Sequence, residues 1–154
     1  MNKVIYRSTR FHCDIHQAFE MFTVNKYLKS WLTKHAEVEP RIGGKYELFW
    51  DPDDKENNST IGCKITTIEK NRVLGFEWKG PPQFKHFMNT AVPLTHVIVF
   101  FIPCSEVNPS PCTEVYLIHS GWGDSAEWQE AKLWFDKAWF NALKNLKEKL
   151  ANDI

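Results

Sequence analysis

The sequence lacks the features that mark several large classes of protein. Its 154 residues carry 19 basic and 19 acidic side chains and therefore no net charge, which argues against a general binder of nucleic acid or anionic membranes. No apolar run approaches the roughly 20 residues of a membrane-spanning helix. The N-terminal stretch MNKVIYRSTRFH has no apolar core of the signal-peptide kind. We expect one cytoplasmic domain over residues 1–154, with no nucleic-acid partner and no membrane insertion.

Metal-binding motifs are lacking as well. The four cysteines form no CxxC pair and have no zinc-ligand spacing to a histidine. They are Cys13, Cys63, Cys104 and Cys112. In a reducing compartment we expect four free thiols, although Cys104 and Cys112 flank a proline-containing loop and could face each other across a hairpin. The HxDxH group at residues 12–16 spans a strand end and a helix start, where Asp14 is better used as an N-cap. We predict no metal and no cofactor.

No nucleotide-binding loop or catalytic fingerprint is present. Gly43–Gly44 lacks a following helix and GxGxxG spacing, so it is interpreted as a turn or a bulge. No spacing indicates a Ser–His–Asp or Cys–His pair, and Glu77 should point away from the core because it alternates with Phe76 and Trp78. The residues alone therefore do not favour an enzyme.

Aromatic side chains, in contrast, are abundant: they make up 14% of the chain and include seven tryptophans. The C-terminal stretch has no Pro or Gly after Gly123, and its apolar residues recur at helical spacing. Asp124, followed three residues later by Glu127, predicts a capping box. We therefore predict one long helix over residues 124–151. Its apolar face carries the large rings Trp128, Phe135 and Trp139.

The rest of the chain predicts two short helices and a series of strands. A strand at residues 3–12 is followed by helices at residues 14–23 and 25–32. From residue 36 the apolar period becomes two, which indicates strands joined by hairpins. These strands are expected at residues 37–39, 45–50, 60–69, 73–78, 94–104 and 113–120. The predicted class is α+β, with an antiparallel sheet covered on one face by the long helix.

Several stretches, in this order, resemble a known family. They are FHCDIHQAFEMF, KYLKSWL, PRIGGKYELFW, VLGFEW and YLIHSGW, followed by the Trp-rich helix. The chain resembles the START-like (SRPBCC) superfamily and, within it, the family of the C-terminal domain of the activator of heat shock protein 90 ATPase homologue. The resemblance implies a helix-grip fold, in which a curved sheet of about six to seven strands wraps around the C-terminal helix. The eukaryotic co-chaperone has a further N-terminal domain, so we expect this chain to be a small single-domain member.

The candidate site lies between the sheet and the long helix. If these side chains lie on the inner faces of their strands and helix, Trp50, Trp78, Trp122 and Trp139 converge in this space. They then form either a filled core or a ring-lined pocket of the kind that binds apolar ligands. His119 is expected on the same inner face, where it could bond a ligand or satisfy a structural partner. The residues 79–93 are too apolar for a simple turn and are expected to cover the site. The candidate ligand contacts are Trp31, Tyr46, Trp50, Trp78, Phe87, His119, Trp122, Phe135 and Trp139.

Three functions are compatible with this pattern. The first is binding of a small hydrophobic or aromatic molecule in the cavity, without catalysis. The second, implied by the resemblance alone, is a co-chaperone-like domain that stimulates a heat-shock-protein ATPase. The third is a cyclase- or hydrolase-like enzyme, which would need a further ionisable group beside His119. The expected partners are a small hydrophobic molecule or, in the second case, a chaperone, and the expected state is a monomer or a homodimer.

Overall fold

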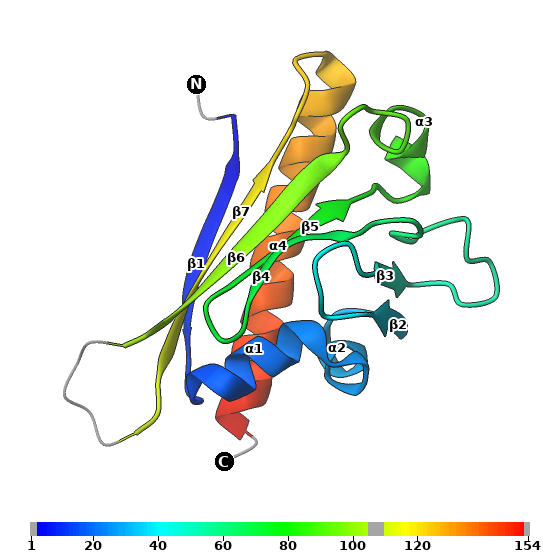
Figure 1. The fold of residues 1–154 in the computed structure, drawn as a ribbon. Helices are drawn as coiled ribbons and strands as arrows, with labels where there is room; N and C mark the ends of the chain where they lie inside the picture. Colours follow the sequence, from blue (N-terminus) through cyan, green and yellow to red (C-terminus); the bar gives the residue numbers. More distant parts are fainter. Residues whose placement is uncertain (1–2, 105–109, 153–154) are drawn as a thin grey trace.

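The computed structural model describes residues 3–104 and 110–152, and it arranges them around the long C-terminal helix (Figure 1). The elements are, in chain order, β1 (Ile5–Phe11), α1 (Ile15–Thr23), α2 (Asn25–Trp31), β2 (His35–Val38), β3 (Tyr46–Phe49), β4 (Ile65–Glu69), β5 (Val73–Trp78), the short 3₁₀ helix η1 (Pro82–Phe84), α3 (Lys85–Met88), β6 (Thr95–Pro103), β7 (Thr113–Ser120) and α4 (Ala126–Asn152). This order confirms the predicted α+β class.

The strands form two antiparallel sheets. A five-stranded sheet has the order β1-β7-β6-β5-β4, and β2 pairs with β3 in a two-stranded sheet. The division has a local cause in the predicted strand at residues 60–69, which becomes regular only at Ile65. Thr60 N donates to Leu48 O at 2.9 Å, but Cys63 N then donates to Thr60 O at 3.0 Å and Gly62 has a φ of +86°, so a turn interrupts the strand there.

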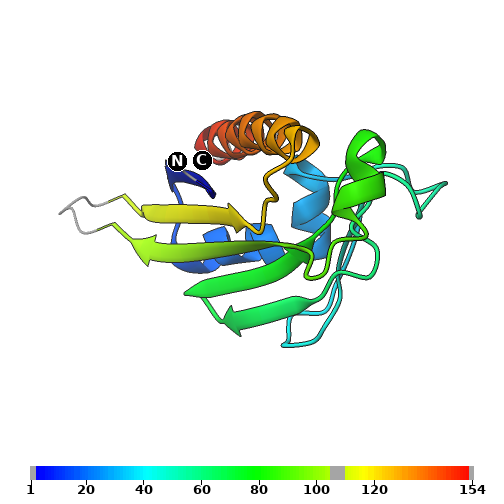
Figure 2. The same cartoon turned by 90° about the horizontal axis from the view of Figure 1, so that it is seen from above.

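Helix α4 lies across one face of the larger sheet, while α1 and α2 close one end of the space between them (Figure 2). Alternate residues of β6 and β7, such as Val97 and Leu117, are fully buried under α4, as period-two strands require. From α4, Ala131, Leu143 and Leu146 are buried against them. The apolar stripe predicted for this helix is therefore the face that meets the sheet.

The helix N-termini confirm one predicted cap and correct another. Asp14 Oδ1 accepts a hydrogen bond from Gln17 N at 2.8 Å and caps α1, as predicted. Helix α4, however, begins at Ala126, and its capping side chain is Ser125, whose Oγ lies 3.3 Å from Trp128 N. The predicted capping box is therefore not formed: the cap is Ser125 rather than Asp124, and the residue three positions after Ser125 is Trp128, which cannot return the hydrogen bond of a Glu or Gln.

The expectation of four free thiols is wrong for one pair. Cys104 and Cys112 form a disulfide with their Cα atoms 5.4 Å apart, and Cys104 N donates to Cys112 O at 3.1 Å. The bond closes the β6–β7 hairpin, as the alternative interpretation had it; residues 105–109 lie outside the described residues. Cys13 and Cys63 are free and buried, and burial raises the pKa of Cys13 to about 11 and that of Cys63 to about 12.

Among the helices of residues 3–104 and 110–152, none is long and apolar enough to span a membrane.

Candidate ligand-binding site

A half-open pocket of about 400 Å³ lies where α4 passes the ends of α2, β3 and β5. Its aromatic lining residues are Trp31, Trp50, Trp78, Trp134, Phe135 and Trp139. Five of the chain's seven tryptophans therefore meet at one place. Asn58, Ser59 and residues 79–83 supply the more polar part of the wall.

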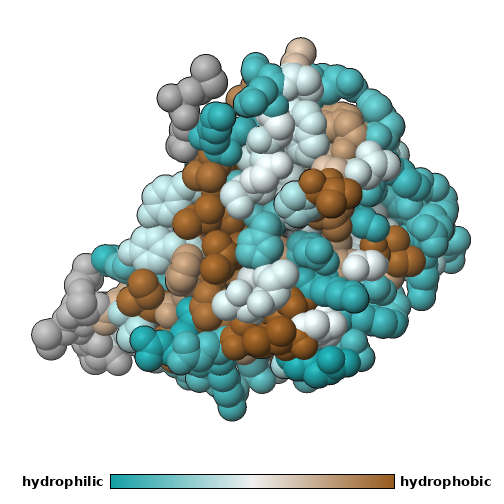
Figure 3. Space-filling view, turned by 45° about the horizontal axis from the view of Figure 1, so that its top comes forward, coloured by the Kyte–Doolittle hydropathy of each residue, from teal (hydrophilic) through white to brown (hydrophobic). Residues whose placement is uncertain are grey.

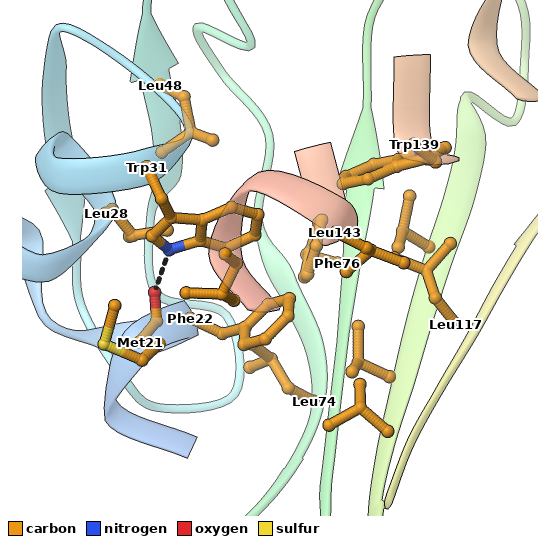
Figure 4. Close-up of a cluster of buried hydrophobic side chains, with 14 of the residues drawn as sticks. Met21, Phe22, Leu28, Trp31, Leu48, Leu74, Phe76, Leu117, Trp139 and Leu143 are labelled. Carbon is orange, nitrogen blue, oxygen red and sulfur yellow. Dashed lines mark hydrogen bonds between the residues drawn. The ribbon is translucent and has the colours of Figure 1, made fainter. Parts of the chain in front are cut away.

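Small side chains on α4 leave the space open. Ala138 and Ala142 line the pocket beside the larger Phe135 and Trp139 on the same helical face. The spacing of these four positions is i, i+3, i+4 and i+7, which keeps them on one side of a helix. In Figure 4, Trp31 of α2 lies on one side of the buried cluster and Trp139 of α4 on the other. Two alanines beside bulky rings thus convert a packing stripe into a pocket wall.

Hydrogen bonds to protein groups hold three of the indole rings. Trp31 Nε1 donates to Met21 O at 2.8 Å, as Figure 4 shows, and Trp50 Nε1 donates to Leu32 O at 2.8 Å. Trp139 Nε1 donates to His119 Nδ1 at 3.0 Å. Because these N–H groups are satisfied within the protein, the rings offer apolar faces to a ligand in a fixed orientation.

Trp78 connects the rings of the sheet to those of the helix. Its ring centroid lies 5.2 Å from that of Trp139 and 6.0 Å from that of Trp50, within the range of favourable aromatic pairs. Phe76, one pleat further along β5, lies 5.6 Å from Trp78 and is fully buried. The wall is therefore a contiguous aromatic surface backed by the core.

His119 lies behind this wall and is fully buried. An indole N–H can only donate, so Nδ1 of His119 is the acceptor for Trp139. Nε2 then carries the proton and donates to Thr95 Oγ1, 3.0 Å away. Burial lowers the pKa of His119 to about 3, so the ring is neutral near pH 7. The structure thus gives His119 the structural role of holding the Trp139 ring.

The pocket brings together five of the nine predicted contacts. Those five are Trp31, Trp50, Trp78, Phe135 and Trp139. Besides His119, three others lie outside its wall. Tyr46 is fully buried and donates its hydroxyl to Phe22 O at 2.8 Å. Phe87 packs on Trp128 at 5.0 Å between centroids, and Trp122 donates from Nε1 to His119 O at 2.9 Å. Tyr46 is therefore part of the core, whereas Phe87 and Trp122 are half-buried in contacts outside the pocket wall.

Some lining residues were not predicted. Trp134 precedes Ala138 by four residues, a helical spacing that indicates the edge of the same face. Lys79 belongs to the segment at residues 79–93 that was expected to cover the site, and residues 79–83 do line the pocket. The segment also contains the short helices η1 and α3. Ala138 and Ala142 lie in the apolar stripe of α4, but a small apolar residue in such a stripe does not by itself indicate a pocket.

The described residues contain no group of three or more His, Cys, Asp or Glu that could hold a metal ion. In the HxDxH stretch Asp14 is occupied as the cap of α1. His16 Nε2 lies 3.4 Å from Glu20 Oε1 one turn later on the same helix. The stretch therefore serves the start of a helix.

The sequence matches a known protein family over most of its length. The model described as Activator of Hsp90 ATPase homolog 1-like protein matches residues 12–151. The chain belongs to this family. The match covers nearly all of the sequence and confirms the resemblance carried by the strand, turn and helix motifs. No curated protein matches the chain.

Solved structures show the same helix-grip fold at low sequence identity. An HSP90 activator from Plasmodium falciparum is 22% identical, with a TM-score of 0.72 and 97% of each chain covered. A protein from Mesorhizobium loti is 16% identical, with a TM-score of 0.72 and 97% of each chain covered. The Aha1 dimer from Colwellia psychrerythraea is 16% identical, with a TM-score of 0.67 and 96% and 95% of the two chains covered.

Proposed function

We propose that the protein binds a small hydrophobic or aromatic molecule in the pocket between α4 and the sheet. The observation that carries the proposal is the ring-lined space itself. Its volume of about 400 Å³ falls in the range of small-molecule sites, which are mostly apolar with a few polar groups. The fixed orientation of Trp31, Trp50 and Trp139 reduces the ordering cost of binding.

The size of the pocket also sets an expected affinity. For a ligand of about 15–20 heavy atoms, about −0.3 kcal/mol per atom gives roughly −4.5 to −6 kcal/mol, or a Kd of tens to hundreds of micromolar. Such a Kd is within the reach of fluorescence titration. Trp139 and Trp31 lie in the wall, so a ligand that enters should quench part of the intrinsic tryptophan emission.

A filled-pocket variant tests the proposal. Ala138→Phe places a ring in the space, whereas Asn145→Phe places the same ring on the exposed side of α4 as a control. With the neutral probe N-phenyl-1-naphthylamine, we expect Ala138→Phe to weaken binding at least tenfold and Asn145→Phe to leave it unchanged. Thermal unfolding of both variants checks that each is folded. Equal binding by the two folded variants would place the ligand elsewhere.

A second candidate function is the binding of a chaperone, and an exposed surface favours it. The sheet face away from α4 carries exposed Tyr6 (53%), Phe100 (37%) and Ile102 (46%). Figure 3 shows a hydrophobic stripe along this side of the molecule. A solvated sheet face is usually polar, so an apolar one suggests an interaction surface. The likeness to the Plasmodium falciparum HSP90 activator suggests the kind of partner.

This candidate is tested by the ATPase rate of an Hsp90 chaperone with the added protein. Phe100→Lys should abolish any stimulation, while Leu133→Lys, on an exposed part of α4, should not. Absence of stimulation by the unmodified chain would remove the candidate. Sedimentation of the same samples distinguishes a monomer from a homodimer.

The geometry offers little support for the third hypothesis, a cyclase or hydrolase. His119 is the residue that an acid–base role would need, and both of its ring nitrogens are hydrogen-bonded within the protein. It is also enclosed behind Trp139 and fully buried. We therefore assign no reaction to the pocket.

A further inference from the structure

The pocket has one charge in its wall. Among the described lining residues only Lys79 carries an ionisable side chain, and the other polar groups are those of Asn58, Ser59 and Gln83. The hydrogen-bonded indoles of Trp31, Trp50 and Trp139 offer no donor to a ligand. A ligand would therefore meet apolar rings over most of its surface and a single cation at one side.

Lys79 stands between two hollows. A second hollow, of about 510 Å³, is lined by Glu56, Ile61, Lys79, Pro82, Lys85, His86, Asn89 and Thr90. Lys79 and Pro82 line both spaces, so the aromatic pocket adjoins a polar one. The ionisable side chains in the wall of the second hollow belong to two lysines, one histidine and one glutamate. An elongated molecule would thus pass from an apolar to a cation-rich environment at Lys79.

Within residues 3–104 and 110–152, the ammonium of Lys79 forms a hydrogen bond but no salt bridge. Lys79 Nζ donates to Ile61 O at 2.6 Å, and this carbonyl carries no charge. An ammonium group has three donors, so further bonds remain for a ligand. The side chain is half-buried at the rim, where an ionic hydrogen bond is stronger than on an open surface.

We propose that the ligand is an amphiphilic anion, with its apolar body among the tryptophan rings and its anionic group, such as a carboxylate, on Lys79. This inference rests on the proposed binding function and names its ligand class. Lys85 lies further along the same path, but its ammonium bonds to Glu56 O and to Asn57 Oδ1, each at 2.8 Å. Lys79 is therefore the cation that first meets an anionic group leaving the aromatic pocket.

A matched pair of probes tests the charge. 2-Naphthoate and 2-naphthamide share one ring system and differ in charge, and calorimetric titration measures the Kd of each. We expect naphthoate to bind about tenfold more tightly than the amide, and this preference should shrink as salt is added. Lys79→Gln should remove the preference and Lys79→Arg should retain it. Lys144→Gln, on the exposed side of α4, is the control and should change nothing.

The possible outcomes distinguish a failure of the anionic-ligand proposal from a failure of the proposed binding function. Equal binding of acid and amide to the unmodified protein would overturn the anionic ligand while the apolar site stands. A preference that persists in Lys79→Gln would overturn the role of Lys79. Failure of both probes to bind at millimolar concentration would count against the binding function itself. If Lys79→Gln fails to fold, the salt dependence of naphthoate binding by the unmodified protein still tests the charge of the ligand, and Lys79→Met takes the place of Lys79→Gln in testing the cation.

Discussion

The two parts of the space beneath α4 use similar residues with opposite results. Toward the start of the helix, the ring centroid of His119 lies 4.5 Å from that of Trp122 and 5.4 Å from that of Phe135, and no room is left. Further along, Trp139 and Trp31 stand apart across a pocket of about 400 Å³. Aromatic content alone therefore does not distinguish a core from a site.

The difference lies in what fills the gaps between the rings. In the filled part, a histidine occupies the gap and connects Trp139 to Thr95 through its two nitrogens. In the open part, the small side chains of Ala138 and Ala142 of α4 line the space and do not fill it. Trp139 belongs to both parts, since its N–H faces His119 and its ring lines the pocket. His119 in the filled part therefore fixes the orientation of Trp139, which is one wall of the pocket.

Removing His119 should have the largest effect. His119→Ala creates a cavity and leaves the Trp139 N–H without its partner, so we expect a loss of about 3 kcal/mol in the free energy of unfolding. His96→Ala, on the adjacent strand β6 and only half-buried, should cost less than about 1 kcal/mol. Urea unfolding measures both. Equal losses would show that His119 is no more structural than its half-buried neighbour.

The same residue should make stability depend on pH. The folded state holds the pKa of His119 at about 3, below the ordinary value near 6.5, so the unfolded state binds more protons between these values. Stability should therefore fall as the pH drops from 6.5, by about 1.4 kcal/mol per unit. Burial also lowers the pKa of His96, which adds in the same direction. His119→Gln should flatten the dependence, whereas the exposed His16→Gln should not.

Trp139→Phe should have a smaller effect on stability than His119→Ala, and it should change both the filled part and the pocket. The ring becomes smaller and His119 Nδ1 loses its donor, for which we expect about 1–2 kcal/mol less stability. The pocket should widen, and N-phenyl-1-naphthylamine should bind several-fold more weakly. Unfolding and probe titration on one preparation measure the two effects. A change in stability with unaltered probe binding would separate the filled part from the pocket.

Much of the fold followed from periodicity, but details that depend on single side chains did not. Period-two alternation placed Leu74, Phe76 and Trp78 on one buried face, and the structure agrees. The predicted strand at residues 60–69 failed at its start because residues 60–63 form a turn, in which Cys63 N donates to Thr60 O at 3.0 Å and Gly62 has a φ of +86°. The Cys104–Cys112 disulfide depends on the pairing of β6 with β7, which the spacing alone left open.

The site was harder to predict than the fold, for a physical reason. Alternation tells which side of a strand faces inward but not how deep a side chain lies. Tyr46 and His119 point inward, and both are sealed from the pocket by rings that pack over them. The open space depends on Ala138, Ala142 and Lys79, which carry no aromatic signal. A pocket forms where small side chains lie next to large ones, and the spacing of the large residues in the sequence does not reveal this.

Enlarging one of the alanines should have the smallest effect on stability and the clearest effect on binding. Ala142→Leu adds apolar volume where space exists, so the free energy of unfolding should change by less than about 1 kcal/mol. The volume available to a ligand decreases, and N-phenyl-1-naphthylamine should bind about tenfold more weakly. The control is Ala151→Leu, on an exposed position of α4 outside the pocket. A large loss of stability in Ala142→Leu would mean that this part is packed as tightly as the surroundings of His119. The contrast between the two parts would then disappear.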